Sequence, residues 1–163
     1  MAHRHVLKTT PEAAALRLLF QEAVSPDSSS APPIVVAIVD TNPEIVRILR
    51  ISLENAGFVA IDMPIEDIKT GVANVKSMLE EHDPRVIVYD VAPPYEQSWR
   101  FLEHLRVTTD FRGRQFVLTA VNVRAAREVL RNDETVHEII GKDADIMEIV
   151  RAVKEASRAR PTR

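Results

Sequence analysis

Short apolar runs and longer amphipathic stretches alternate along this chain. Five of the runs consist mostly of apolar and β-branched residues and have the composition of buried strands. They are Ile34–Asp40, Phe58–Ile61, Val86–Asp90, Gln115–Ala120 and Val136–Lys142. Continuous apolar runs of this length are typical of parallel strands that are covered on both faces. The last run contains polar residues, which favours a place at the edge of the sheet.

The stretches between these runs have the apolar spacing of helices. A helix is expected to begin at Pro43, with Thr41 or Asn42 as its cap, and to end at Gly57, where a left-handed C-cap is expected. Its inner face is predicted to consist of Ile45, Ile48, Leu49, Ser52, Leu53 and Ala56.

Four further helices are expected along the chain. A single helix should carry Ile68, Val72, Val75 and Leu79 on one stripe and end before Pro84, although Gly71 weakens its first turns. The others are expected from Trp99 to about Arg106, from Val123 to Arg131, and after Asp145, which can cap the last helix.

Strand and helix therefore alternate about five times, which predicts an α/β domain with a parallel sheet and right-handed crossovers. We assign this domain to residues 34–159. Before it, Thr10–Val24 has the apolar stripe of an additional helix, and Ser25–Pro33 has the composition of a linker. Residues 1–33 are thus an N-terminal helical extension with a linker, and residues 160–163 are a basic tail.

Composition narrows the classes of function. The chain has 163 residues, a formal net charge of −3 and no cysteine. Disulfides, thiol catalysis and thiolate metal sites are therefore excluded, and the charge gives no reason to expect binding to nucleic acid or to an anionic membrane. No apolar run is long enough to cross a bilayer, so a cytoplasmic protein is expected.

Polar residues stand where four of the predicted strands end. They are Asp40, Asp90, Thr119 and Lys142. If the sheet is doubly wound, these side chains converge on one edge, where open α/β sheets bind their ligands. Two acids, a hydroxyl and an ammonium group suit phosphoryl transfer: carboxylates hold Mg²⁺, a lysine neutralises phosphoryl charge, and an aspartate can be the nucleophile.

Each of these residues also has a purely structural interpretation. Asp90 could cap a loop or a helix start, and Asp40 could cap the helix at Pro43 or pair with Lys142. Thr119 is at home in any strand, and an isolated lysine is usually a surface residue. The case for a site depends on the four residues occurring in order on the expected elements.

From Ile34 to about Ala159 the chain resembles the receiver domain of two-component response regulators. The residues that carry the resemblance are Ile38-Val-Asp40, Gly57-Phe58, Val88-Tyr-Asp90, Leu118-Thr119-Ala120 and Lys142. The resemblance implies a flavodoxin-like, doubly wound, five-stranded parallel sheet with strand order 2-1-3-4-5. The Thr10–Val24 helix would be an addition to that fold.

The resemblance also implies roles for individual residues. Asp90 would accept a phosphoryl group from a phosphohistidine, with Thr119 and Lys142 contacting the phosphoryl oxygens. Mg²⁺ would be held by Asp40, by Asp90 and by the backbone carbonyl of Ala92. The implied partners are a sensor histidine kinase or phosphotransfer protein and a downstream protein, and a homodimer is possible. Because the chain ends soon after the fifth helix of the domain, output is expected to come from partner binding.

Several positions depart from the family pattern. Thr41 replaces the usual second acid, so weak Mg²⁺ binding is expected, because ligand charge sets much of the affinity. Asp143 follows Lys142 in place of the usual proline, and Ile139 stands at the usual aromatic switch position. The loop Val91-Ala-Pro-Pro94-Tyr also differs from the common form.

Three functions remain open from the sequence. The first is a stand-alone, non-enzymatic receiver that signals after phosphorylation of Asp90. The second is a degenerate receiver that binds partners without phosphorylation, which Thr41, Asp143 and Ile139 favour. The third is a small enzyme or cofactor binder; it is disfavoured because no glycine-rich phosphate loop follows the first strand, and Ala92 stands where an aspartate-based phosphatase would have its second acid.

Overall fold

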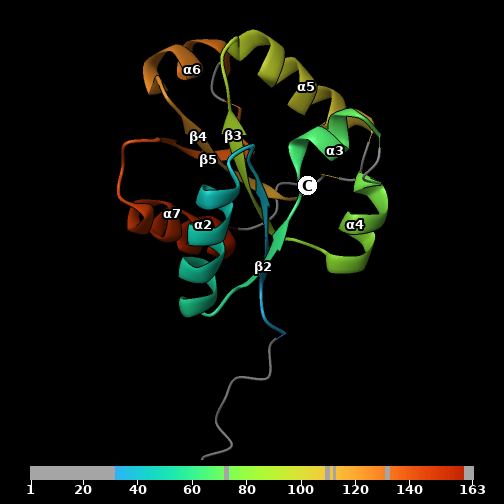
Figure 1. The fold of residues 1–163 in the computed structure, drawn as a ribbon, viewed down its shortest axis with the longest axis vertical. Coiled ribbons are helices and arrows are strands. Elements are labelled where there is room, and N and C mark those ends of the chain that lie inside the picture. The colour runs from blue at the N-terminus through green and yellow to red at the C-terminus, as the bar shows by residue number, and fades with distance from the viewer. Residues whose placement is uncertain (1–31, 72–73, 109–110, 112, 131–132, 160–163) are drawn as a thin grey trace, which may run out of the picture. The chain divides into compact units, whose positions relative to one another are not determined.

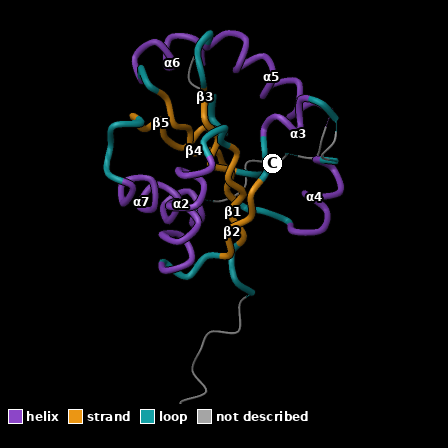
Figure 2. The backbone as a smooth tube through the Cα atoms, in the orientation of Figure 1, coloured by secondary structure: helices purple, strands orange, loops and turns teal. Residues whose placement is uncertain are grey.

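The computed structural model contains one five-stranded parallel sheet in the order β2-β1-β3-β4-β5 (Figures 1 and 2). The strands are β1 (Val35–Val39), β2 (Val59–Asp62), β3 (Val86–Val91), β4 (Gln115–Ala120) and β5 (Val136–Gly141). All neighbouring pairs are parallel. The predicted α/β class, the five strands and the 2-1-3-4-5 order are confirmed, and the run with polar residues, β5, lies at an edge.

The structure describes residues 32–71, 74–108, 111, 113–130 and 133–159. The chain divides between Pro32 and Pro33, and every element described here belongs to the second unit. The predicted helix at Thr10–Val24 and the basic tail at residues 160–163 lie outside the described residues.

Helices cover both faces of the sheet. They are α2 (Pro43–Asn55), α3 (Ile65–Lys69), α4 (Val75–His82), α5 (Tyr95–Thr108), α6 (Val123–Leu130) and α7 (Ile146–Arg158). One apolar core joins α2 and α7 to the sheet, and a second joins α3, α4, α5 and α6 to its other face. Figure 1 shows α2 and α7 together on one side, with α3, α4 and α5 on the other.

The termini of α2 and α7 follow from short polar signals. The Asn42 side chain accepts the Glu44 N–H at 3.0 Å, so Asn42 rather than Thr41 caps α2, and Asp145 caps α7 by accepting the Met147 N–H at 3.0 Å. Gly57, just after α2, has φ +91°, a left-handed conformation that glycine adopts without strain. The cap predicted at Gly57 is confirmed.

One position in α2 was assigned to the wrong face. Ile48 is 47% exposed, although its spacing suggested a place in the core, whereas Leu49 and Leu53 are buried as predicted. The apolar stripe of a helix is wider than the surface that this sheet and α7 cover. The neighbouring Ile51 is 48% exposed for the same reason.

The prediction of one helix between β2 and β3 was wrong. The segment forms a short α3 and a separate α4, and Gly71 lies between them with φ +73°. A residue in the left-handed region cannot continue a right-handed helix. Asn74 then starts α4 by accepting the Ser77 N–H at 3.1 Å. Ile68, Val75 and Leu79 are buried and reach the core from two helices, whereas the predicted inner residue Val72 lies outside the described residues.

The other two helices agree with their predictions apart from their ends. Helix α5 begins at Tyr95, four residues before Trp99, and continues two residues beyond Arg106, and α6 lies where it was expected. Trp99 is 7% exposed and packs in the core, with the Arg106 guanidinium 5.9 Å from its ring centroid. Within the described ranges, no helix has both the length and the apolar character needed to cross a bilayer.

Candidate functional site

Asp90 lies at the carboxyl end of β3, the central strand of the sheet. All six residues of β3 are buried, and Asp90 is only 4% exposed. In the parallel register, Asp90 stands opposite Thr119 of β4. The Thr119 hydroxyl donates a hydrogen bond to Asp90 Oδ1 at 3.0 Å. Two residues that are 29 positions apart are therefore joined because their strands pair.

Lys142 reaches the same carboxylate from the other side. It follows β5 directly, and its backbone N–H donates to the carbonyl of Ala120 at 3.0 Å, which ties this loop to the end of β4. Its Nζ lies 2.7 Å from Asp90 Oδ2. The Lys142 side chain is 35% exposed and that of Asp90 is 3% exposed. The ammonium group therefore compensates a buried charge from the surface side.

Asp40 is the second buried acid at this edge and is 8% exposed. Its Oδ1 accepts the Asn42 N–H at 2.8 Å. Burial raises the pKa of Asp40; the Asn42 N–H opposes this shift, the charge of Asp90 adds to it, and Lys142 opposes it. The Asp40 carboxyl is therefore close enough to Asp90 and Lys142 for their charges to act on it.

The structural alternatives for Asp40 can now be compared with its contacts. Asn42 caps α2, so Asp40 orders the loop before the helix rather than capping it. Within the described residues, the ion pair of Lys142 is with Asp90. Two buried carboxylates thus share one nearby ammonium group. The excess negative charge fits a hard divalent cation, and the carboxylate oxygens have free lone pairs that can coordinate it.

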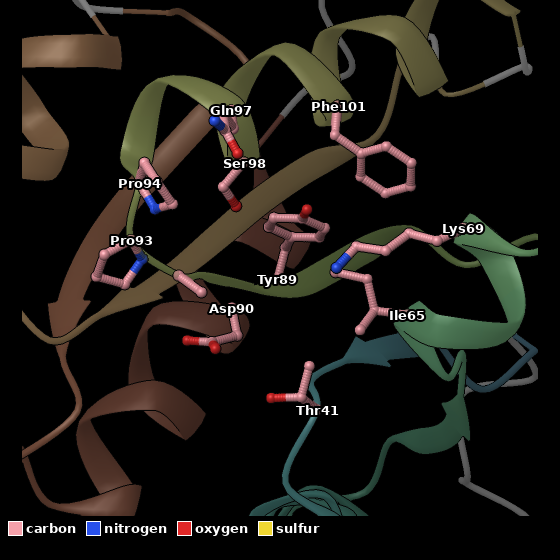
Figure 3. A pocket seen from close by; sticks show the side chains of 11 residues that line it. Thr41, Ile65, Lys69, Tyr89, Asp90, Pro93, Pro94, Gln97, Ser98 and Phe101 are labelled. Carbon is pink, nitrogen blue, oxygen red and sulfur yellow. The ribbon is translucent and has the colours of Figure 1, made fainter.

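Thr41 and Ala92 lie on exposed loops beside Asp90, after β1 and β3. Both line a pocket that also includes Asp90. In Figure 3 the Thr41 hydroxyl and the Asp90 carboxylate are turned to the same side, away from Lys69. A hydroxyl therefore occupies the place beside Asp90 where the family pattern has an acid. The role of the Ala92 carbonyl as a metal ligand stays a prediction.

The other two departures have clear structural settings. Ile139 is partly buried and packs against the core that contains α5 and α6. Asp143 is exposed, and its carboxylate lies over Gly141, where any added Cβ would collide with it. Gly141, which directly precedes Lys142, thus leaves room for the Asp143 side chain. Lys142 nonetheless points its ammonium group at Asp90.

A third acid at this edge of the sheet was not predicted. Asp62 is the last residue of β2, and its Oδ2 lies 2.5 Å from the Arg50 guanidinium of α2. Its Oδ1 is buried and has no hydrogen-bond partner among the described residues. The signal that identified Asp40 and Asp90, an acid at the end of an apolar run, was also present here.

A second polar contact joins the loops that leave Asp90 and Thr119. The Asn122 N–H, just before α6, donates to the Tyr95 hydroxyl at 2.9 Å, and Tyr95 is the first residue of α5. The Asn122 side chain also accepts the Ala125 N–H at 3.1 Å, as a cap for α6. These bonds fix the loop after β4 relative to the loop after β3. Sequence reasoning missed this contact because neither residue stands at a strand end.

No family model matches this sequence, and no curated protein matches it. Solved structures do match. A sensor protein from Polaromonas sp. JS666 is 18% identical, with a TM-score of 0.62 over 77% of this chain and 97% of that one. A response regulator from Thermotoga maritima is 15% identical, with a TM-score of 0.58 over 78% of this chain and all of that one.

A response regulator receiver domain described as CheY-like, from Methylobacillus flagellatus, gives a similar result. It is 14% identical, with a TM-score of 0.57 over 77% of this chain and 99% of the other. At such identities the similarity concerns the fold, and it spans nearly the whole length of these structures. The resemblance that the sequence motifs indicated is confirmed at that level: this chain has the fold of response regulator receiver domains.

Proposed function

We propose that the protein is a receiver module in a two-component phosphorelay and that Asp90 is its phosphoacceptor. The observation that carries the proposal is the pair of contacts on the buried carboxylate, from the Thr119 hydroxyl at 3.0 Å and from the Lys142 ammonium at 2.7 Å. A buried carboxylate needs such partners, and the same two groups are suited to bind phosphoryl oxygens. The receiver fold adds support for a signalling role.

In the proposed reaction, one oxygen of the ionised Asp90 attacks the phosphorus atom of a phosphohistidine on a sensor kinase or phosphotransfer protein. A P–O bond forms, the P–N bond breaks, and the histidine leaves with the electron pair of that bond and takes up a proton. The product is an aspartyl phosphate. Thr119 and Lys142 hold the carboxylate in place beforehand, and Lys142 neutralises charge that the phosphoryl group brings.

A divalent cation such as Mg²⁺ is part of this proposal. Asp40 and Asp90 would hold it, with the Ala92 carbonyl as a further oxygen donor. The cation would offset the charge that repels an anionic phosphoryl donor from two carboxylates. Thr41 contributes no charge, so binding should be weak. Phosphorylation would then alter the surface that a downstream partner recognises, because Thr119 near the end of β4 and Lys142 in the loop after β5 would both contact the phosphoryl group.

The test is an intact-mass measurement after incubation with Mg²⁺ and acetyl phosphate, a small acyl-phosphate donor. We expect a mass increase of one phosphoryl group in the wild type and none in Asp90→Asn. Asp62→Asn is the matched control, since it removes an acid from the end of β2, which β1 separates from β3, and should leave the adduct intact. An adduct that persists in Asp90→Asn would refute the assignment.

The second candidate is a degenerate receiver that binds partners without phosphorylation. The neutral Thr41 beside Asp90 is the observation in its favour. It predicts no adduct in the same experiment, with the fold intact by circular dichroism. It also predicts that Asp90→Asn leaves partner binding unchanged. We favour the phosphoacceptor because all three residues that such chemistry needs, Asp90, Thr119 and Lys142, are present and in contact.

A further inference from the structure

A second site lies next to Asp90, on the other side of its backbone. A cavity of about 300 Å³ is bordered by the end of β3, by α3 and by the first turns of α5 (Figure 3). This volume is at the lower end of the range for small-molecule pockets. In Figure 3 the Asp90 carboxylate is turned away from Tyr89 and Lys69. The cavity shares Thr41, Asp90 and Ala92 with the candidate phosphorylation site, and its other lining residues have no part in the proposed phosphoryl transfer.

Tyr89 is the first of these groups. It is 1% exposed, it lines the cavity, and its buried hydroxyl has no hydrogen-bond partner among the described residues. Burial raises the pKa of Tyr89, the neighbouring Ser98 hydroxyl lowers it, and the charge of Asp90 raises it further. The Ser98 hydroxyl is thus close to that of Tyr89 but does not meet the geometry of a hydrogen bond with it. An unsatisfied buried hydroxyl is costly, so an acceptor brought by a ligand would be stabilised here.

Lys69 supplies a positive charge to the same cavity. Figure 3 shows its side chain directed from α3 toward the space that Tyr89 lines. Its ion-pair partner is Glu66, one turn away at 3.2 Å, and both side chains are well exposed, at 46% and 68%. Such a surface pair adds little stability, so the ammonium group can exchange Glu66 for a ligand at small cost. Asp90, the acid at the rim, is already compensated by Lys142.

The other residues of the cavity wall are of two kinds, hydrogen-bond donors and apolar side chains. Gln97 and Ser98 add an amide and a hydroxyl group that can donate hydrogen bonds. Ile65 and Phe101 provide an aliphatic and an aromatic surface opposite them. A cation, several donors and an apolar wall together suit an anionic head with acceptor oxygens that is attached to a compact apolar body.

We propose that this cavity binds a small organic carboxylate whose apolar body has about the size of one ring. The carboxylate oxygens accept hydrogen bonds from the Lys69 ammonium and the Tyr89 hydroxyl, and the apolar body packs against Ile65 and Phe101. The Tyr89 hydroxyl is covered in this structure, so the contact requires a rotation of side chains at the cavity wall. The proposal does not depend on phosphorylation of Asp90.

Benzoate is a suitable probe because it combines a carboxylate with a single ring. Sodium benzoate is titrated into the full-length chain without Mg²⁺ or phosphodonor, at constant ionic strength, and binding is followed by amide chemical shifts. We expect saturable binding in the millimolar range, with the largest shifts in α3, the end of β3 and the start of α5. Benzylamine, which replaces the anion by a cation on the same ring, should not bind.

Three variants test the contacts. Lys69→Met should weaken benzoate binding at least tenfold, and Tyr89→Phe, which keeps the ring, should weaken it about fivefold. Lys76→Met is the matched control, because Lys76 is an exposed lysine of α4 that pairs with Glu80 outside the cavity, and it should have no effect. Equal affinities of Lys69→Met and Lys76→Met would overturn the proposal.

Inorganic phosphate tests the apolar part of the proposal. It carries more charge than benzoate but has no body to pack against Ile65 and Phe101, so it should bind at least tenfold more weakly. If phosphate binds as tightly as benzoate, the site is a general anion site and the assignment to carboxylates with an apolar body is wrong. The absence of any saturable benzoate binding would refute the site altogether.

Discussion

Tyr89 and Asp90 are consecutive residues of β3, and both are almost fully buried, yet their polar atoms have opposite surroundings. Both carboxylate oxygens of Asp90 accept a hydrogen bond, one from Thr119 and one from Lys142. The Tyr89 hydroxyl has no hydrogen-bond partner within the described part of the chain. Successive side chains of a strand point to opposite faces, so the two groups meet different elements.

The difference follows from where the partners come from. Asp90 is satisfied by residues at the ends of β4 and β5, whose positions are fixed by pairing within the sheet. Tyr89 points toward α3 and α5, where the nearby hydroxyl belongs to Ser98 on a helix. The register of paired strands determines which polar residues stand side by side at the edge of the sheet. The packing of helices against the sheet is determined by apolar surfaces, and here it leaves the Tyr89 hydroxyl without a partner among the described residues.

Removal of the Lys142 ammonium should produce the largest effect on stability. Lys142→Met leaves the buried Asp90 charge with only a hydroxyl partner, and removal of one member of a buried pair is strongly destabilising. Because Lys142 is 35% exposed, water makes up part of the loss, and we expect the free energy of unfolding to fall by about 2 kcal/mol. Urea unfolding at pH 7 measures this change.

The double variant identifies the cause of that loss. In Asp90→Asn/Lys142→Met the buried charge is gone, so the double variant should be more stable than Lys142→Met alone. If the two are equally unstable, Lys142 acts through its packing or through the loop after β5, and the charge of Asp90 is not what its ammonium group compensates.

Two hydroxyl deletions compare the neighbouring residues of β3 directly. Thr119→Val removes a hydrogen bond to a buried carboxylate and should lower the free energy of unfolding by about 1.5 kcal/mol. Tyr89→Phe removes a hydroxyl that has no partner, and it should leave stability unchanged or raise it by about 0.5 kcal/mol. Parallel urea titrations give both values, and a loss of more than 1 kcal/mol in Tyr89→Phe would contradict the described contacts.

The sequence was most informative about polar contacts between residues at the ends of the strands. The apolar runs predicted the five strands, and the residues at their ends predicted that Asp90, Thr119 and Lys142 would meet, because parallel strands bring their carboxyl ends together. The same logic would have identified Asp62, which also ends a strand. The order of the strands came from the family resemblance, since alternation of strand and helix does not determine it.

Features that depend on how helices lie on the sheet were not predicted. The break at Gly71 depends on a left-handed residue, which the apolar stripe through Ile68 and Leu79 cannot reveal. The exposure of Ile48 depends on how much of α2 the rest of the domain covers. The cavity at Tyr89 combines side chains from three elements, and their spacing along the chain carries no common pattern.

Asp40 provides the smallest expected effect and a test with a definite sign. Burial and the nearby Asp90 raise the pKa of Asp40, so its ionisation is less favourable in the folded state than in the unfolded state. The contribution of Asp40 to folding stability is therefore fully present below the ordinary aspartate pKa of 3.8, where the carboxyl is protonated. It is lost as the pH rises through the raised pKa of the folded state. Asp40→Asn should consequently be more stable than the wild type at pH 7.

The pH dependence and Mg²⁺ separate this explanation from others. The advantage of Asp40→Asn in urea unfolding should disappear as the pH falls well below 3.8, where the wild-type carboxyl is protonated in both states. Mg²⁺ should raise the midpoint of the wild type and leave that of Asp40→Asn nearly unchanged, because the proposed cation needs the carboxylate that destabilises the metal-free fold. Asp62→Asn should be less stable than the wild type at pH 7, since Asp62 pairs with Arg50. A stability loss in Asp40→Asn at pH 7 would mean that its bond to the Asn42 N–H outweighs the cost of burying the charge.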